Sequence, residues 1–202
     1  MSLQGQRLRF SDIVSLVLNP SVMTGVFFCF LAGKFEPPGF GRFAHAALSV
    51  LFTSLIPVGL LFVLKARGKL SDVEMHIRSE RDRVYLLCAA CYGLGAGILF
   101  VTGASWPLWG FLAWHVPNTI LLIAVNRRLK VSIHTMVLTS LYVGVLIFYG
   151  TRLAPAGILI LAAAWARWDA GNHSWAELLC GMLIGGVLSP IEISLLQKAF
   201  GG

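Results

Sequence analysis

The chain has 202 residues, of which 57% are hydrophobic and 12% are charged. A soluble domain of this size usually carries about 25% charged residues, so the composition argues against a soluble protein. The mean hydropathy of +0.78 is instead typical of a chain embedded in a lipid bilayer. The formal net charge of +7 then indicates contacts with lipid headgroups rather than with nucleic acid.

Seven apolar stretches, separated by charged and turn residues, are candidate membrane spans, because a bilayer core about 30 Å thick needs roughly 20 helical residues. They cover residues 12–33, 44–65, 84–102, 107–126, 133–149, 153–166 and 174–197. The fifth and sixth stretches are short, so residues 150–152 are alternatively predicted to form a tight hairpin that reaches only partway across. We expect an all-α polytopic transmembrane helix bundle of about six or seven spans. It forms a single integral membrane domain, residues 1–202, whose motif-bearing part is 66–197.

Four hydrophilic segments should emerge on one face of the membrane, because two crossings separate each of them from the next. They are the N-terminus and segments 66–83, 127–132 and 167–173, and together with Lys65, which directly precedes the second of them, they hold twelve of the 16 lysines and arginines. The positive-inside rule predicts that this face is cytoplasmic, and we expect a bacterial inner (plasma) membrane. If some of these cations bind an anionic substrate, the charge count says less about topology.

Ionisable residues at the ends of membrane helices cost free energy and are therefore candidates for function. Three clusters lie on the shared face. They are "DVEMHIRSERDR" in segment 66–83, "LKVSIHT" with Lys130, Ser132 and His134, and "ARWDAGNHSWAE" with Arg167, Asp169, His173 and Glu177.

The third cluster has residues suited to phosphoryl transfer. His173 and Glu177 lie one helical turn apart, so their side chains can share a face. A carboxylate there can accept the N–H of one imidazole nitrogen and leave the other nitrogen as a nucleophile or base. Arg167 can hold phosphate oxygens through its planar guanidinium. With a second imidazole at His134, one ring can attack while the other protonates the leaving oxygen.

The third cluster resembles a motif of the type 2 phosphatidic acid phosphatase superfamily. These lipid phosphate phosphatases share their site with vanadium haloperoxidases. The motif reads SR-x5-H-x3-D, and "ARWDAGNHSWAE" keeps its spacing through Arg167, His173 and Glu177. Ala166 replaces the Ser of the family, and Glu177 replaces its Asp.

The other two clusters resemble the remaining motifs of the family less closely. "VSIH" resembles PSGH and keeps Ser132 and His134, with Val and Ile in place of Pro and Gly. A degenerate form of K-x6-RP begins at His76 and lacks both the Lys and the Pro. The arginines of this first cluster that are candidate phosphate ligands are Arg78, Arg81 and Arg83.

The resemblance implies a membrane-embedded lipid phosphatase that hydrolyses a phosphate monoester or a pyrophosphate of a lipid. His173 would form a phosphohistidine, Glu177 would orient it, and His134 would protonate the departing alcohol. The phosphoryl oxygens, on which charge accumulates in the transition state, would be held by Arg167, Ser132, Lys130 and an arginine of the first cluster. No metal or other cofactor is implied, and the partners are the lipid phosphate substrate and membrane lipids.

Other interpretations of the same residues remain open. A lipid phosphotransferase would use the same phosphohistidine but pass the phosphoryl group to another lipid. In a non-enzymatic transporter or lipid-binding protein the two histidines would be structural. The i, i+4, i+8 spacing of Asp169, His173 and Glu177 also permits a metal site, if another helix supplies a further ligand.

Several polar or small residues within the spans are expected to serve packing. His45 and His115 are predicted to be core residues with satisfied hydrogen bonds, and Glu192 to be structural. Gly181 and Gly185 have the small-xxx-small spacing that lets two membrane helices approach closely. We therefore expect a tight helix contact near the start of the last span.

Overall fold

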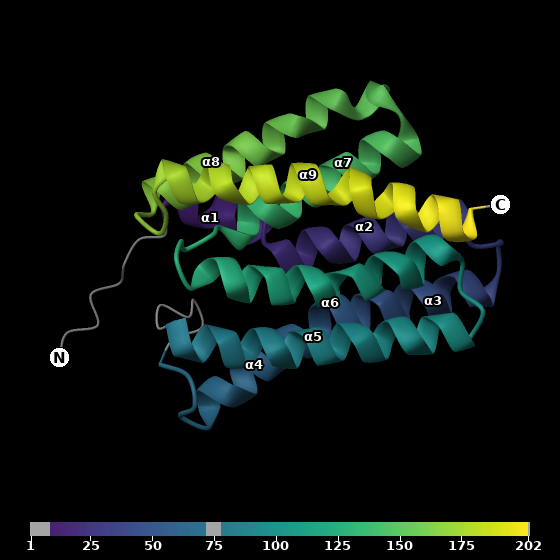
Figure 1. The fold of residues 1–202 in the computed structure, drawn as a ribbon, viewed down its shortest axis with the longest axis horizontal. Coiled ribbons are helices and arrows are strands. Elements are labelled where there is room, and N and C mark those ends of the chain that lie inside the picture. The colour runs from purple at the N-terminus through teal and green to yellow at the C-terminus, as the bar shows by residue number, and fades with distance from the viewer. Residues whose placement is uncertain (1–8, 72–77, 202) are drawn as a thin grey trace.

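The computed structural model describes residues 9–71 and 78–201, and over these ranges the chain forms helices and no strand (Figure 1). The α-helices are α1 (Phe10–Val17), α2 (Pro20–Phe35), α3 (Phe40–Val50), α4 (Ile56–Ala66), α5 (Arg78–Val101), α6 (Trp106–Asn126), α7 (Ile133–Tyr149), α8 (Ile158–Asp169) and α9 (Trp175–Phe200). A π-helical segment, Leu51–Leu55, joins α3 to α4, and a 3-10 segment, Thr151–Gly157, joins α7 to α8. The predicted all-α helix bundle is confirmed.

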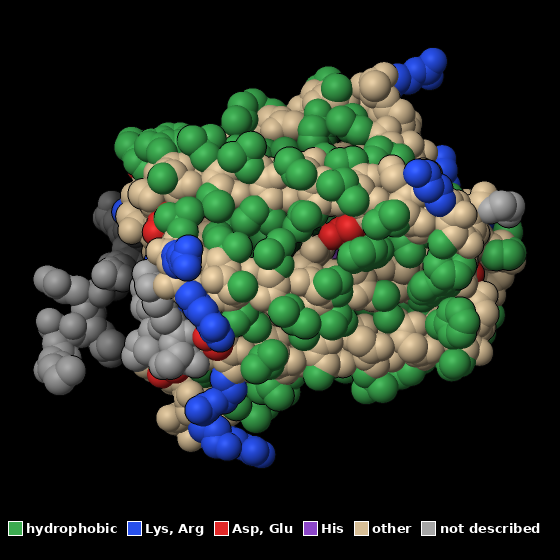
Figure 2. All heavy atoms as spheres, in the orientation of Figure 1, with side chains coloured by type: hydrophobic (Ala, Val, Ile, Leu, Met, Phe, Trp, Pro, Cys, Tyr) green, Lys and Arg blue, Asp and Glu red, His purple; other side chains and the backbone are tan. Residues whose placement is uncertain are grey.

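In the described part of the chain, five helical stretches are long and apolar enough to cross a bilayer. They are Phe10–Phe35, Phe40–Ala66, Glu80–Val101, Trp106–Asn126 and Trp175–Phe200. With 17 residues, α7 rises about 25 Å, and α8 has 12 residues, so both are short, as the sequence indicates. Hydrophobic side chains cover the middle of the molecule, and lysines and arginines gather towards its two ends (Figure 2). The protein is therefore a polytopic membrane protein.

Two boundaries differ from the sequence-based expectation. The first stretch breaks after α1, because Pro20 opens a new helix and the side chain of Asn19 caps it by accepting the Ser21 N–H at 2.9 Å. Helix α5 begins at Arg78 rather than near residue 84, so the end of segment 66–83 is helical and not a loop. The consequence is that arginines in this segment project from fixed directions of a helix.

The described parts of the four hydrophilic segments lie at one end of the bundle, as predicted, whereas residues 1–8 and 72–77 are outside the described chain (Figure 1). Arg9 Nη1 donates to the backbone oxygen of Asp169 at 3.5 Å, and Lys130 Nζ donates to that of Asn172 at 3.0 Å. We call this the site end, formed by Arg9 with residues 67–71, 127–132 and 170–174. The opposite end, formed by residues 36–39 and 102–105 and by the C-terminus, is called the far end.

Close packing of α7 on α9 brings the second and third clusters together. A Cβ atom added to Gly181 would lie 2.6 Å from the backbone oxygen of Ser132, and one added to Gly185 would overlap the backbone oxygen of Met136. The predicted close contact at these two glycines is therefore confirmed. Because Gly181 faces the start of α7, its lack of a side chain sets how near Ser132 comes to α9.

Candidate functional site

The start of α7 is fastened to the first turn of α9. The backbone N–H of Ser132 donates to the backbone oxygen of Glu177 at 3.3 Å. One turn further on, Thr135 Oγ1 donates to the backbone oxygen of Leu178 at 3.0 Å. These two bonds hold the "VSIH" segment beside the "ARWDAGNHSWAE" segment, although about 40 residues of chain separate them.

The loop between α8 and α9 carries His173. Gly171 has a φ of +72°, which only a glycine adopts without strain, and the backbone N–H groups of Asn172 and His173 turn back to the Arg167 oxygen at 3.1 and 3.3 Å. Helix α9 then starts with a capping box, in which Glu177 Oε2 accepts the N–H of Ser174 at 3.0 Å. The same oxygen accepts His173 Nδ1–H at 3.1 Å.

The imidazole of His173 is held in one tautomer by this contact. Because Nδ1 carries the proton that Glu177 accepts, the lone pair lies on Nε2. The side chain is only 8% exposed. Burial, followed by the positive charges of Lys130 and Arg167, lowers the pKa of His173, and the Glu177 carboxylate opposes this shift only in part. The ring is therefore neutral at neutral pH, as a nucleophile requires.

Arg167 is positioned by two residues that the sequence analysis did not identify. Its Nη1 donates to Ser15 Oγ at 3.1 Å, from α1. With the amide oxygen of Asn172 turned towards the guanidinium, Nη1 and Nη2 donate to it at 3.1 and 3.2 Å. Asn172 could have been noticed beside His173, whereas only the fold brings Ser15 to this position.

His134, near the start of α7, belongs to the same group of side chains. It lies within electrostatic range of both Arg167 and His173, and its ring is close to the backbone of Ser15. Ser15 thus contacts the guanidinium through its side chain and the imidazole through its backbone. The structure brings Arg167, His134 and His173 together at one end of the bundle.

The candidate arginines of the first cluster differ in their surroundings. Arg81 is 5% exposed, whereas Arg83 is exposed. Two residues along an α-helix correspond to a rotation of about 200°, so these side chains leave α5 on opposite sides. Arg78 lies in the first turn of α5, but its side chain is not among those that the structure describes. The whole of His76 lies outside the described residues.

The alternative of a metal site finds little support in the geometry. Asp169 is exposed, and it does not join His173 and Glu177, which contact each other. Within residues 9–71 and 80–201, no group of three or more His, Cys, Asp or Glu side chains is arranged to hold a metal ion.

Tryptophans flank the loop that carries His173. Trp168 and Trp175 are both about half exposed, and their rings lie 5.6 Å apart. Trp165, one turn before Trp168, packs against Phe10 of α1 with ring centroids 6.0 Å apart. Tryptophan concentrates at the boundary between water and hydrocarbon, so these rings indicate that the loop sits at headgroup depth.

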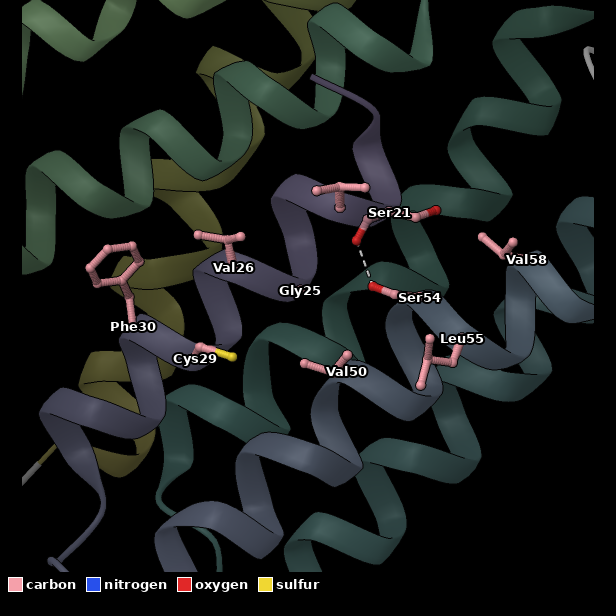
Figure 3. Close-up of a pocket in the computed structure, with 10 residues that line it drawn as sticks. Ser21, Gly25, Val26, Cys29, Phe30, Val50, Ser54, Leu55 and Val58 are labelled. Atoms are coloured by element: carbon pink, nitrogen blue, oxygen red, sulfur yellow. Dashed lines mark hydrogen bonds between the residues drawn. The ribbon is translucent and has the colours of Figure 1, made fainter. Parts of the chain in front are cut away.

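A groove of about 710 Å³ lies elsewhere, between α2 and the α3–α4 region (Figure 3). Its lining is almost entirely apolar, and Ser54 Oγ donates to the Ser21 backbone oxygen at 2.6 Å at one place in it. None of the candidate site residues lines this groove. His45 and His115, also outside the site, have the expected bonds, to Glu36 at 2.8 Å and to the Phe111 oxygen at 2.7 Å.

Comparison of the chain with family models, curated proteins and solved structures gives no match.

Proposed function

We propose that the protein hydrolyses a phosphate monoester or a pyrophosphate of a membrane lipid through a phosphohistidine formed on His173. The observation that carries this proposal is the gathering of the cations Arg167 and Lys130 around His173, whose 3.1 Å hydrogen bond from Nδ1 to Glu177 leaves Nε2 as the nucleophile. The motif resemblance to type 2 phosphatidic acid phosphatases supports the same assignment.

The reaction then has two steps. In the first, the Nε2 lone pair of His173 attacks phosphorus, and the bond from phosphorus to the lipid oxygen breaks. His134, as the imidazolium that the negative charge of the bound phosphate stabilises, gives its proton to that departing oxygen. In the second, water attacks phosphorus, the N–P bond breaks, and His134 takes the proton of the water. Phosphate leaves, and both imidazoles return to their starting states.

Arg167 and Lys130 contribute by stabilising charge. Both are near enough to His173 to affect its titration, so they are also near a phosphoryl group bound to it. Negative charge on the transferred phosphoryl oxygens is stabilised by donors that are already oriented, which costs no reorganisation during the reaction. The hydrogen bonds to Ser15 and Asn172 orient Arg167 in this way.

A lipid is the substrate class that fits the position of the site. The tryptophans beside the loop favour a site at headgroup depth, and α1 exposes apolar residues such as Leu16 and Val17 next to it. A phosphorylated headgroup can enter sideways while its chains stay in the bilayer. We further propose, from the positive-inside rule, that the site faces the cytoplasm at a bacterial inner membrane.

The test is phosphate release by the purified full-length protein from a panel of lipid phosphates. We expect release to resist chelators and to fall by at least about a thousandfold in His173→Ala. His45→Gln, at the far end, is the matched control and should keep its activity per folded molecule. Activity in His173→Ala equal to wild type would remove the covalent mechanism, loss on chelation would favour a metal, and transfer to an added lipid alcohol in preference to water would favour a phosphotransferase.

A further inference from the structure

Within the residues that the structure describes, three side chains near the site end each bury a hydrogen-bond donor that has no acceptor. Arg81 Nε, Asn126 Nδ2 and Ser132 Oγ make no hydrogen bond, in residues that are only 5%, 4% and 0% exposed. They come from three elements: α5, the end of α6 and the segment that opens α7. Buried donors without acceptors are rare in folded proteins, so three in one region require an explanation.

These donors belong to one continuous region. Asn126 Oδ1 accepts the backbone N–H of Val131 at 2.9 Å, and Val131 directly precedes Ser132. The phenol of Tyr85, one helical turn after Arg81, interacts with the side chains of both Arg81 and Asn126, but it does not give Arg81 Nε or Asn126 Nδ2 an acceptor in hydrogen-bonding geometry. Because the bond to Val131 fixes the orientation of the amide of Asn126, its Nδ2 is held in a fixed direction on the other side of the carboxamide.

Arg81 presents the largest cost. Its Nε has no acceptor among the described residues, and the residue is almost fully buried. A buried charge without a partner is strongly destabilising, and each buried neutral donor without an acceptor adds to the cost. A ligand with several acceptor oxygens and a negative charge would remove all three penalties, whereas a water molecule would leave the charge uncompensated.

We propose that Arg81, Asn126 and Ser132 form an oxyanion pocket, in which Asn126 Nδ2 donates to a phosphoryl oxygen. The identity of the anion as a substrate phosphoryl group rests on the proposed function, but the affinity of the pocket for an oxyanion does not. Asn126 is the new member of the site, since none of the motif patterns includes it. Its role is to add a neutral, oriented donor on the α6 side of the phosphoryl group.

Asn126→Asp tests this role with little disturbance of the fold. The new carboxylate still accepts the Val131 N–H, but it replaces the Nδ2 donor with a negative charge that repels an oxyanion. In purified full-length protein in detergent, inorganic phosphate should raise the unfolding temperature of the wild type and bind Asn126→Asp at least about tenfold more weakly. Without phosphate, the variant should unfold at no lower temperature than the wild type, because the carboxylate compensates Arg81.

Asn19→Asp is the matched control. It adds the same charge and keeps the acceptor for the Ser21 N–H, so it should bind phosphate like the wild type. Ser132→Ala is a second variant, whose fold should be preserved because Ser132 Oγ makes no hydrogen bond, and it too should weaken phosphate binding. The second variant keeps the proposal falsifiable if Asn126→Asp does not fold.

The outcomes separate this pocket from the proposed reaction. His173→Ala should still bind phosphate while losing hydrolysis. Phosphate binding by Asn126→Asp or Ser132→Ala as tight as in the wild type would overturn the pocket, as would a wild type that phosphate does not stabilise. Hydrolysis by His173→Ala would overturn the phosphohistidine and leave the pocket standing.

Discussion

The two ends of the bundle carry the same kinds of side chain in different states of hydrogen bonding. At the far end, Glu36 accepts the N–H and the hydroxyl of Ser105, each at 2.6 Å, and His45 Nδ1–H at 2.8 Å. Arg42 donates to the backbone oxygen of Glu36 through Nη2 at 2.7 Å and Nε at 3.0 Å. This network joins the α2–α3 loop to the α5–α6 loop, and its donors are used within the chain.

The site end has a similar pair, His173 with Glu177, but neighbouring donors remain unused. Among the described residues, a buried donor without an acceptor is found in each of Arg81, Asn126 and Ser132. A histidine paired with a carboxylate is therefore not by itself a sign of a functional site in this protein. The two ends differ in hydrogen bonding. The satisfied network at the far end stabilises the fold, whereas the unsatisfied donors at the site end can bind a ligand.

The largest expected effect is a difference in phosphate release between variants of two arginines in α5, Arg81 and Arg83. Arg81→Met should lower phosphate release by about 10²–10³-fold, because it removes a buried donor to the phosphoryl group. The same variant should unfold at a higher temperature, since it removes an uncompensated buried charge. Arg83→Met, which changes an exposed side chain, should change activity by no more than about twofold. Equal losses in the two variants, measured per folded molecule, would remove Arg81 from the site.

The far end should respond in stability and not in activity. Glu36→Gln should cost about 2–3 kcal/mol of unfolding free energy, because it weakens hydrogen bonds from Ser105 and His45 to a buried carboxylate. Burial alone would raise the pKa of Glu36, but the bonds from Ser105 and His45 outweigh it and hold the pKa below its ordinary value.

The same carboxylate should give stability a dependence on pH. The pKa of Glu36 is lower in the folded protein than in the unfolded chain. Its contribution to folding stability is therefore fully present above pH 4.5 and is lost as the pH falls through the folded pKa. Thermal unfolding of wild type and Glu36→Gln between pH 3 and 7 measures this. A difference between the two proteins that does not shrink towards pH 3 would contradict the prediction.

A smaller effect is expected where the site depends on close helix packing. Gly181→Ala should cost about 1–3 kcal/mol, because the added methyl group overlaps the start of α7 and must push it away from α9. Activity should fall with it, as Ser132 and His134 move from His173. Gly186→Ala is the control on the same helix, since its Cβ would meet only Thr139 Cγ2 at an ordinary 3.5 Å.

The smallest effects concern the titration of His173. Because its pKa is lowered, the acid limb of the kcat/KM profile should lie below pH 6.5, where protonation removes the nucleophile. Lys130→Met removes a positive charge and should move this limb to higher pH, and Glu177→Gln should move it to lower pH. Shifts in the same direction for both variants would mean that the limb reports another group.

The sequence alone determined the fold class and the five long apolar spans, and it predicted most residues of the candidate site. Long apolar stretches cannot bury their backbone polar groups in a bilayer except as helices, and an even number of crossings places four charged segments at one end. The spacing of Arg167, His173 and Glu177 is local, because five- and three-residue intervals around a helix start already bring these side chains near one another.

Only the tertiary structure decided which neighbours complete the site. Ser15 lies 152 residues from Arg167 in sequence, and only the contact of α1 with α8 brings them together. Asn126 is five residues from Val131, but no motif pattern includes it, and its burial beside the site is decided by packing. The choice of Arg81 over Arg83 depends on which side of α5 faces its neighbours, a rotation that was not predicted because segment 66–83 was read as a loop. Burial and the satisfaction of hydrogen bonds are properties of packed helices, so no spacing within a single segment can reveal them.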